Sequence, residues 1–573
     1  ELEDLIHEYR EALVQDPSRV ETIHRLIEEK AKKLNLFFRS IDELEEYIYE
    51  MKRSVIPKGL HVLGKVPGRE EIIEYLTLVA RYDRDEAKSL HRLVAEAQGL
   101  NYDELLKRAS KDLVEIENRV REIITAMIDG REVVREFPRE LRRDVERSIE
   151  FLRDLYNRVV ASDEIRAILR ALDGGYVPPR VAGDPIRTPE AYPTGSHGYA
   201  FDPRLIPSKA ALERGAKIAE EMLKRYYEKH GRYPESIGVV LWAFETAGTR
   251  GETIGQILRL LGVRLVRRHG PWQWDLEVIP LEELGRPRID VVVTICGIFR
   301  DMFPNLITMI DRAVKLVASL NEPENMNYVK KHMRELREHS TLRIFGPKPG
   351  QYATRLPELI ETSAWRTTED LVKIYIEDMS YGYGENIEGA PSTEVFKKLL
   401  SSVEAVSQIR YAHEYEITDL DHYYEFFGGL KSVVETLRRE KIESIWIDTT
   451  TERIKYKEAR EAIEFSARTR LLNPKWIENM LKHGYDGVRE IAKRVEYVLG
   501  LAATTGEVPD WVFNEIAERY LFNEKTREEM MKHNRWAVIE IAKRLYEGLE
   551  RGLWRASEEN IDKLRRIYTT LRG

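Results

Sequence analysis

Acidic side chains occupy the turn of a predicted strand-turn-helix segment, LWAFETAGTRGETIGQIL, at residues 241–258. The segment begins as a buried strand and ends as a helix, and Glu245, Arg250 and Glu252 lie between the two. A phosphate-binding turn of the type GxxxxGKS/T needs a lysine and free backbone amides, whereas this turn has two glutamates and no lysine. We therefore do not expect a nucleotide at this turn, and the GxxxxGKS/T motif is absent from the rest of the sequence.

The acidic turn has two interpretations. Carboxylates near a helix N-terminus and an arginine are expected to stay ionised, because opposite charge and amide donors lower their pKa. Such carboxylates can accept protons from a ligand or hold a divalent cation. Alternatively, Glu245 pairs with Arg250 and Glu252 caps the following helix. For Glu252 we favour the cap.

Four apolar segments in the middle of the chain predict short buried strands. Continuous apolar strands that alternate with amphipathic helices indicate a parallel sheet covered on both faces. We expect an α/β fold, with a central, mostly parallel sheet domain flanked by N-terminal and C-terminal helical regions. The four segments are SIGVVLWAF, PRIDVVVTICGIF, EAVSQIRYA and ESIWIDTT. The expected regions are a helical one at 1–173, a Pro/Gly-rich connection at 174–207, the α/β domain at 208–452 and a helical one at 453–573.

Polar side chains, most of them acidic, follow these strands. In open α/β sheets, ligands bind beyond the carboxyl ends of the strands. We therefore expect an acidic cleft with histidines at this edge of the sheet. In strand order, the residues are Glu245, Thr246, Arg250 and Glu252; Arg300 and Asp301; His413, Glu414, Glu416, Asp419, Asp421 and His422; and Asp448, Thr449 and Thr450.

Two histidines lie in distinctive contexts. His61 interrupts a helical region in PKGLHVLGKVPG, and His422 follows Asp421 in TDLDHYYEFFGG. A single histidine is more often structural or solvated than catalytic, so neither is assigned a role from its own context. His332 and His339 lie seven residues apart among charged residues, which predicts a solvated helix face.

Two further stretches have a structural and a functional interpretation. Tyr423 and Tyr424 could stack on a flat ligand, although aromatic residues before GG more often close a core. Lys348, in the loop FGPKPGQYATRL, could contact an anionic group or belong to a plain surface loop.

Composition describes an ordinary globular protein. The 573 residues include 91 basic and 99 acidic ones, interleaved along the chain, for a net charge of -8. Without a polybasic block, nucleic-acid binding is not expected. The longest apolar runs are shorter than the roughly 20 residues that cross a bilayer, and no signal-peptide pattern is visible. The single Cys296 has no disulfide or zinc partner, which suits an inert core thiol and a cytoplasmic location.

Many stretches together resemble the large, tetrapyrrole-binding subunit of the cobalt and magnesium chelatases. They occur in the family's order over nearly the whole chain and correspond to the C-terminal part of that subunit, which agrees with a sequence that opens at Glu1 inside an amphipathic pattern. The matching tracts include GLHVLGKVP, GDPIRTPEAYPTG, FDPRLIP, LWAFETAGTRGETIGQILRLLGVR, IPLEELGRPRIDVVVTICGIFRDMFPNLITMIDRAV, RIFGPKPGQY, DLDHYYEFFGG, ARTRLLNPKWIENMLKHGYDGVREI, TTGEVPDW and RGLWRASEENIDKLRRIY.

The resemblance implies insertion of a divalent metal into a tetrapyrrole, with ATP hydrolysed by separate AAA+ partner subunits. FETAGTRGE and the GG after HYYEFF resemble the cobalt branch, whereas IDTTTERI and ARTRLLNPKW resemble the magnesium branch. We favour Co2+ insertion in cobalamin biosynthesis. The alternatives are Mg2+ insertion into protoporphyrin IX and a tetrapyrrole-binding protein without catalysis. A glycosyltransferase-like or other nucleotide-dependent α/β enzyme is disfavoured by the acidic strand ends.

Metal insertion needs carboxylate or imidazole bases and transient metal ligands, because the metal loses water while pyrrole N–H protons leave. On the resemblance, the catalytic residues are Glu245, His422 and Asp421, and Glu245 and His422 also serve as transient metal ligands. Arg300 would pair with a macrocycle carboxylate and Asp301 would orient it. The expected substrate-binding residues are His61, Arg300, Asp301, Tyr423, Tyr424 and Lys348.

Overall fold

The computed structural model of the protein describes residues 1–85, 87–107, 109–196, 202–267, 273–336 and 340–572. Its contacts divide the chain into two compact units, Glu1–Ala200 and Phe201–Gly573. Among the described residues, no helix is long and apolar enough to cross a membrane.

The first unit is built from amphipathic helices. The helix in SIDELEEYIYEMK begins as its sequence predicts, because the Ser40 hydroxyl accepts a hydrogen bond from the Glu43 amide (3.2 Å). Ile41 and Leu44 of the same helix are buried in a shared core. The helices of this unit are α1 (Leu2–Gln15), α2 (Val20–Lys33), α3 (Ile41–Lys52), α4 (Arg69–Val79), α5 (Leu90–Ala97), α6 (Tyr102–Leu105), α7 (Lys111–Ile128), α8 (Arg142–Val160) and α9 (Glu164–Leu172).

An eight-stranded sheet forms the centre of the second unit. The four predicted strands are its middle: β1 (Ser236–Leu241), β4 (Asp290–Ile295), β8 (Val403–Arg410) and β9 (Glu443–Asp448). The strand order is β10-β9-β8-β1-β4-β5-β6-β7, and β9, β8, β1, β4 and β5 are parallel neighbours. The predicted mostly parallel α/β fold is therefore confirmed.

Short strands at the margins were not predicted. They pair antiparallel at both ends of the sheet, and one separate hairpin lies outside it. These strands are β5 (Ile344–Gly346), β6 (Tyr381–Gly384), β7 (Ile387–Pro391) and β10 (Lys455–Glu458), with the hairpin formed by β2 (Val263–Arg267) and β3 (Trp274–Val278).

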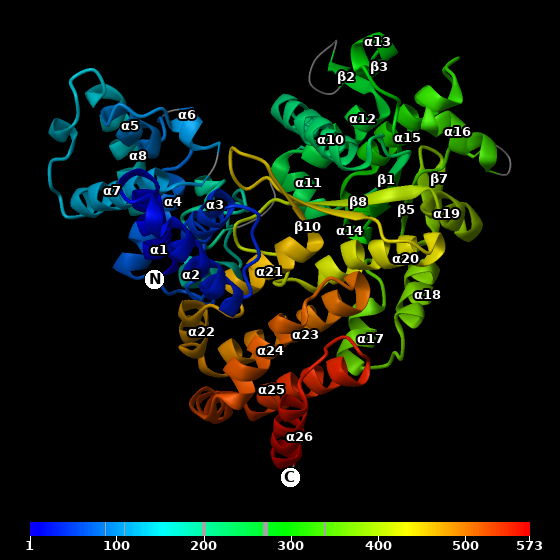
Figure 1. Cartoon of the computed structure of the whole chain (residues 1–573). Coiled ribbons are helices and arrows are strands. Elements are labelled where there is room, and N and C mark those ends of the chain that lie inside the picture. The colour runs from blue at the N-terminus through cyan, green and yellow to red at the C-terminus, as the bar shows by residue number, and fades with distance from the viewer. Residues whose placement is uncertain (86, 108, 197–201, 268–272, 337–339, 573) are drawn as a thin grey trace. The chain divides into compact units, whose positions relative to one another are not determined.

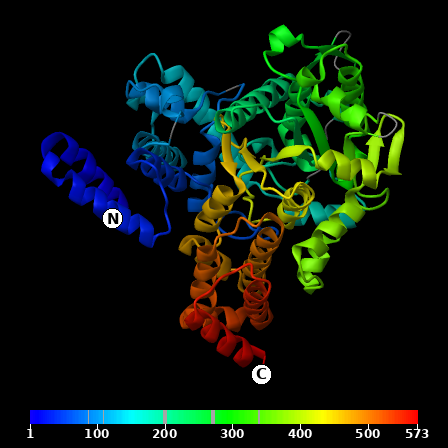
Figure 2. The ribbon, with the colours of Figure 1, turned by 45° about the vertical axis from the view of Figure 1, so that its right-hand side comes forward.

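Helices cover both faces of the sheet (Figures 1 and 2). On one face, Ile237 and Val239 of β1 share a core with α10, α12 and α15, whereas Gly238 faces Leu430 of α20 on the other. The helices near the sheet are α10 (Lys209–His230), α11 (Ala243–Thr249), α12 (Glu252–Leu261), α13 (Leu281–Leu284), α14 (Gly297–Met302), α15 (Pro304–Ala318), α16 (Tyr328–Glu335), α17 (Leu356–Thr362), α18 (Thr368–Met379), α19 (Thr393–Leu400) and α20 (Gly429–Arg438).

The C-terminal helices belong to the same compact unit as the sheet. Arg544 of α25 fastens them to α17, because its buried guanidinium donates to the carbonyls of Ile360 (2.9 Å) and Glu361 (2.6 Å). The helices are α21 (Ala459–Thr469), α22 (Pro474–Leu481), α23 (Gly484–Thr505), α24 (Asp510–Ala517), α25 (Glu524–Glu550) and α26 (Glu558–Arg572).

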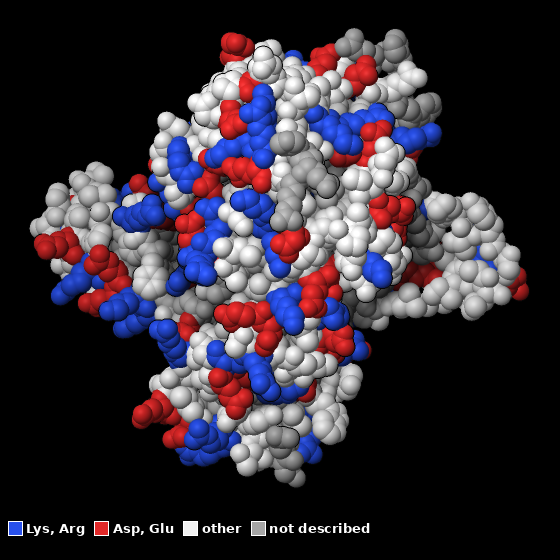
Figure 3. All heavy atoms as spheres, turned by 90° about the vertical axis from the view of Figure 1, so that its right-hand side faces the viewer, with Lys and Arg blue, Asp and Glu red and all other residues white. Residues whose placement is uncertain are grey.

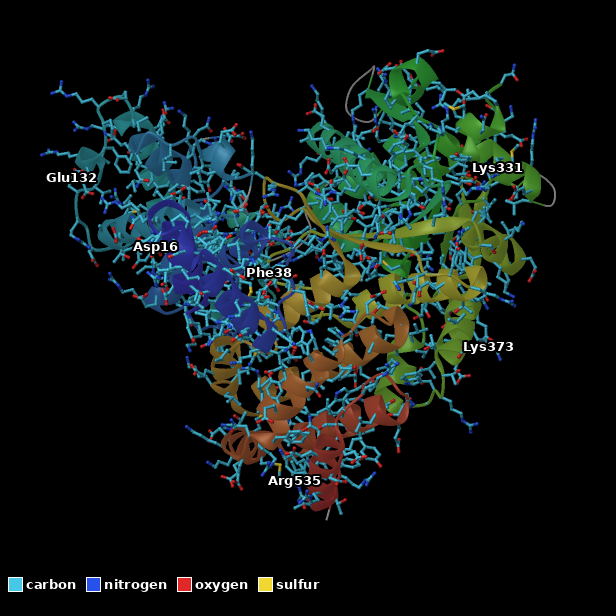
Figure 4. All side chains as sticks on the ribbon, viewed as in Figure 1. Asp16, Phe38, Glu132, Lys331, Lys373 and Arg535 are labelled. Carbon is cyan, nitrogen blue, oxygen red and sulfur yellow. The ribbon has the colours of Figure 1, made fainter. Side chains whose placement is uncertain are left out.

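A charge network closes the amino end of the sheet. Asp290, the first residue of β4, accepts hydrogen bonds from Arg343 Nε (2.8 Å) and His332 Nδ1 (2.8 Å). His332 Nε2 lies 3.3 Å from Glu235, which also pairs with Lys331 (2.6 Å). Figure 4 labels Lys331 on its helix. Because Asp290, Arg343 and His332 are buried, this network holds the starts of β1, β4 and β5 together.

The prediction of a solvated face for His332 is therefore wrong. Its side chain is buried, and neighbouring carboxylates raise its pKa although burial opposes them. The charged residues around it in sequence suggested solvent, whereas the structure pairs it with acids distant in sequence. His339 lies outside the described residues.

The GG after HYYEFF has a packing role. Gly428 ends a π-helical turn, Tyr423–Gly428, that leads into α20. A methyl group on Gly428 would overlap the Thr504 side chain of α23, and one on Gly429 would lie 2.5 Å from the Tyr375 ring of α18. Both glycines have ordinary helical φ angles, so close packing is what requires them.

We expect Gly428→Ala to lower the free energy of unfolding by about 1–3 kcal/mol, the usual cost of overpacking a core. Gly548→Ala is the matched control, since Gly548 is also helical but its added methyl would meet atoms no closer than 3.6 Å. Urea unfolding measures both. Equal stability of the two variants would contradict the packing role.

Candidate active site at the carboxyl edge of the sheet

Glu245 lies on α11, directly beyond β1, and its side chain is buried (1% exposed). The carboxylate accepts hydrogen bonds from the hydroxyls of Thr249 (3.0 Å) and Thr246 (3.4 Å). Burial raises the pKa of Glu245 to about 7, and the neighbouring threonine hydroxyls oppose this rise only in part. The prediction that opposite charge keeps Glu245 firmly ionised is therefore wrong.

Thr249 connects Glu245 to the start of α12. Its hydroxyl oxygen accepts hydrogen bonds from the amides of Gly251 (3.2 Å) and Glu252 (3.1 Å) while its proton is donated to Glu245. Thr249 thus accepts the first amides of α12, whose N-cap is Gly251. The prediction that Glu252 is the cap is wrong, because its carboxylate pairs with Arg214 of α10 (2.7 Å).

The glycines of this turn allow close packing. A methyl group on Gly248 would lie 2.8 Å from the Tyr411 ring, and one on Gly255 would lie 2.9 Å from the Ala211 carbonyl of α10. Gly251 has a φ of +97°, which side chains other than glycine rarely adopt. Each of these glycines therefore has a structural explanation, either close packing or a positive φ.

His422 stands at the start of the π-helical turn and is half-exposed (49%). Its Nδ1 is hydrogen-bonded to Oε2 of Glu425 (2.9 Å), which is fully buried, and Asp421 lies 3.6 Å from the same nitrogen. Burial lowers the pKa of His422, but Glu425 outweighs this effect and the net pKa is raised. The other Glu425 oxygen accepts the Thr354 amide (2.5 Å), so the carboxylate is fixed at both ends.

Trp242, directly after β1, contacts the π-helical turn. Its ring stacks on Tyr423 at 5.0 Å between centroids and meets the His422 ring edge-on at 5.5 Å. Tyr423 and Tyr424 are buried, the second against Gly500. The predicted role of these tyrosines as a lining for a macrocycle does not fit this structure, because their rings form core.

Arg300 is turned toward the loop after β5. It donates to Asp301 (2.7 Å) and to the carbonyls of Lys348 and Gln351 (3.1 Å each). Its side chain is only 8% exposed, whereas Lys348 is exposed. The predicted contact of Arg300 with a macrocycle carboxylate, oriented by Asp301, stays a prediction, as does ligand binding by Lys348.

Two exposed aromatic residues at this edge were not predicted. Phe244, beside Glu245 on α11, is 42% exposed, and Tyr352, whose carbonyl accepts the Gly297 amide, is 53% exposed. Their sequence signal was weak, because single aromatic residues in a strand-turn-helix segment normally predict core.

His61 belongs to the first unit. Its Nε2 lies 3.0 Å from Glu164, and its side chain is 65% exposed while Glu164 is buried. The Glu164 carboxylate also accepts the Gly64 amide (2.5 Å), which fixes the loop around His61. The predicted substrate-binding role of His61 stays a prediction.

Arginines neutralise most of the acidic residues at the strand ends. Arg410 Nη1 pairs with Glu416 (2.9 Å) and Asp448 (2.8 Å), and Arg494 holds Asp419 (2.9 Å). Glu245 and Glu425 differ from these, because their hydrogen-bond partners are hydroxyls, an amide and an imidazole. Over the part of the chain that the structure describes, no cluster of three or more His, Cys, Asp or Glu could hold a metal ion.

A family model described as CobN/Magnesium Chelatase matches residues 1–561. The chain belongs to this family. Within it, the magnesium-chelatase subunit ChlH of Oryza sativa subsp. indica is 34% identical over 91% of this chain and 41% of its own length. The aerobic cobaltochelatase subunit CobN of Pseudomonas aeruginosa is 32% identical over 97% of this chain and 49% of its own length.

A solved structure of the CobN/magnesium-chelatase family has the same fold. The catalytic subunit of cobaltochelatase from Mycobacterium tuberculosis superposes with a TM-score of 0.91 and 31% identity, over 100% of this chain and 51% of that one. The chain thus spans about half the length of the curated relatives it matches. Basic and acidic side chains alternate over the face shown in Figure 3, as the interleaved sequence predicts.

Proposed function

We propose that this chain acts in the large, tetrapyrrole-binding subunit of a cytoplasmic metal chelatase, which inserts a divalent metal into a tetrapyrrole. Family membership supports the reaction class. The observation that carries the proposal is Glu245, a buried carboxylate with no arginine or lysine among its hydrogen-bond partners and a pKa raised to about 7. Such a group is suited to accept a proton at neutral pH.

The chemistry requires proton acceptors. A metal ion that enters the ring forms bonds to the pyrrole nitrogens, and inner N–H protons of the ring leave. Glu245 accepts one of them as general base. The metal is a substrate that passes through the site, and Glu245 and His422 are its proposed transient ligands, with Asp421 beside His422.

Two metal ions, Co2+ and Mg2+, are candidates for the metal substrate. We favour Co2+ in cobalamin biosynthesis, which the similar cobaltochelatase structure supports. The similarity to a magnesium-chelatase subunit supports Mg2+. Gly428 and Gly429 no longer support Co2+ over Mg2+, because close packing explains both glycines whichever metal is inserted. ATP is proposed to be hydrolysed by AAA+ partner subunits.

The test mixes the complete large subunit with a metal-free corrin precursor or porphyrin, Co2+ or Mg2+, ATP and the AAA+ partners. The expected result is an ATP-dependent absorbance change with one of the two metals. Binding of the macrocycle without metalation would support a binding protein without catalysis. Absence of any ATP-dependent change with either metal would overturn the proposal.

A further inference from the structure

Tyr352 lies in the loop 347–355, which connects β5 to α17 at the carboxyl edge of the sheet. Its carbonyl accepts a hydrogen bond from the Gly297 amide (3.0 Å), and a methyl group on Gly297 would lie 2.6 Å from the Tyr352 Cα. The Arg300 guanidinium lies 5.6 Å from the centre of the Tyr352 ring, and a hydrogen bond with Asp301 raises the pKa of the phenol. Protein contacts therefore hold the ring in place, although the residue is 53% exposed.

The backbone of this loop is anchored at both ends. At the first end, the Tyr383 phenol of β6 donates to the Pro347 carbonyl. At the second end, the Thr354 amide donates to the buried Glu425 carboxylate (2.5 Å). The residues between these anchors, 348–353, are all exposed. Because the backbone is already ordered, binding of a ligand to these side chains costs little conformational entropy in the loop.

Phe244 presents a second exposed ring at the neighbouring strand end. It is the second residue of α11, directly beyond β1, and is 42% exposed. Because β1 and β4 are parallel and end in register, α11 and α14 begin side by side, and the two helices are in contact. The Cys296 thiol, directly after β4, contacts the backbone of Ala243. Phe244 follows Ala243, and Tyr352 packs on the residue that follows Cys296, so Phe244 and Tyr352 flank the same junction.

Exposed aromatic rings are suited to a flat, apolar ligand. Each ring that a ligand covers buries a large apolar area, and two π systems prefer offset-stacked or edge-to-face contact. Single exposed aromatic residues are common on protein surfaces and need no ligand. Phe244 and Tyr352 differ from such residues in position, because Phe244 precedes Glu245 on α11 and Tyr352 adjoins Arg300. Both rings therefore lie among the candidate site residues.

We propose that Phe244 and Tyr352 form the surface on which the flat face of the tetrapyrrole lies, with their rings in contact with its pyrrole rings. The inference rests on the proposed function. It assigns the aromatic contact to exposed residues of α11 and of the loop after β5, whereas Tyr423 and Tyr424 belong to the core. A macrocycle bound there lies next to Glu245, the proposed base, which follows Phe244 in sequence.

Arg300 is the positioning residue of this surface. Its Nη1 donates to the carbonyls of Lys348 and Gln351 (3.1 Å each), so the guanidinium fixes the middle of the loop. The same guanidinium lies against the Tyr352 ring. Only 8% of the Arg300 side chain is exposed, which leaves little of it for a ligand. Arg300 therefore acts on the macrocycle through Tyr352.

The test titrates the metal-free porphyrin or corrin precursor into the complete large subunit, without ATP, metal or AAA+ partners, and follows the absorbance of the macrocycle. Phe244→Ala and Tyr352→Ala should each raise the Kd about 10-fold, and Tyr352→Phe, which keeps the ring, should restore most of the affinity. Tyr227→Ala is the matched control and should bind as the wild type does. Tyr227 is 47% exposed near the end of α10, the helix that precedes the amino end of β1.

Arg300→Met tests the positioning role. It should weaken binding as much as Tyr352→Ala, and the double variant should bind no more weakly than either single variant, because both changes act on one contact. These losses should persist with a macrocycle whose carboxylates are esterified, since the contact is made to the ring face. A loss in Arg300→Met that is confined to the free carboxylate form would overturn the positioning role, because it would mean a direct contact with a macrocycle carboxylate.

Tyr352→Ala keeps the test open if Phe244→Ala fails to fold, since Tyr352 is an exposed loop residue. A wild-type Kd in Tyr352→Ala, or an equal loss of affinity in Tyr227→Ala, would overturn the proposed surface. These outcomes differ from failure of the proposed function, in which the wild-type subunit with its AAA+ partners metalates neither macrocycle.

Discussion

Glu245→Gln is expected to slow metal insertion by about 10²- to 10⁴-fold, the range for loss of a general base, and to weaken macrocycle binding much less. The glutamine keeps the shape of the side chain and can still accept the hydrogen bond from Thr249, but it cannot take up a proton. In the wild type, the rate should rise as the pH passes about 7, because the carboxylate acts only when it is ionised.

The same substitution should stabilise the fold at high pH. The pKa of Glu245 in the folded protein is about 7, above its ordinary value of 4.5, so the folded state holds a proton that the unfolded chain releases between these values. Stability from this residue is present below pH 4.5 and is lost as the pH rises toward 7. The loss amounts to about 3 kcal/mol at high pH, and glutamine avoids it.

Metalation assays and urea unfolding at pH 5 and pH 9 measure the two effects. Glu282→Gln on the exposed surface of α13 serves as the control. Two results would contradict this role of Glu245: unchanged turnover in Glu245→Gln, or a free energy of unfolding with the same pH dependence as the wild type.

Arg410→Met should lower the free energy of unfolding at pH 7 by about 3–5 kcal/mol. Arg410 is buried between Glu416 and Asp448, and removal of one partner leaves buried charge uncompensated. Burial alone would raise the pKa of Asp448, but Arg410 outweighs it and holds that pKa below its ordinary value of 3.8. The stability from this pair is present above pH 3.8 and is lost as the pH falls, so the defect of the variant should shrink on acidification.

Urea unfolding at pH 7 and pH 3 measures this difference. The control is Arg334→Met, because Arg334 forms an exposed pair with Glu324 and such pairs contribute roughly 0–1 kcal/mol. If Arg410→Met were as stable as Arg334→Met at pH 7, the buried ion pairs would not hold this edge of the sheet.

The sequence reveals β1 and β4 most clearly, because these strands are buried on both faces. β1 and β4 are mostly apolar, and every residue of each is buried. β6 has the sequence YGYG and β7 is mostly exposed, so neither has the apolar run or the alternation that marks a strand. Their place is decided by pairing, of β6 with β5 and of β7 with β6, which no local pattern reports.

The strand ends that carry the candidate residues were predictable from the sequence, whereas the surroundings of each carboxylate were not. The order of strands and turns led to Glu245 and His422, because strand ends collect ligands in this fold class. The protonation of Glu245 depends on burial, which local sequence does not give. Glu425 was not among the predicted site residues, because its aromatic context, HYYEFF, is typical of a hydrophobic core. The sequence did show that Glu425 lies three residues after His422.

The hydroxyl of Thr249 has a stereochemical consequence for Glu245. Two backbone amides occupy its oxygen, so its proton has only the Glu245 Oε1 atom to bond, and Oε1 acts as an acceptor in both protonation states. The longer hydrogen bond from Thr246 (3.4 Å, against 3.0 Å from Thr249) leaves Oε2 as the oxygen more open to an incoming proton. The two oxygens of the carboxylate therefore differ as proton acceptors. The first turn of α12 sets this difference, because its amides orient the Thr249 hydroxyl toward Oε1.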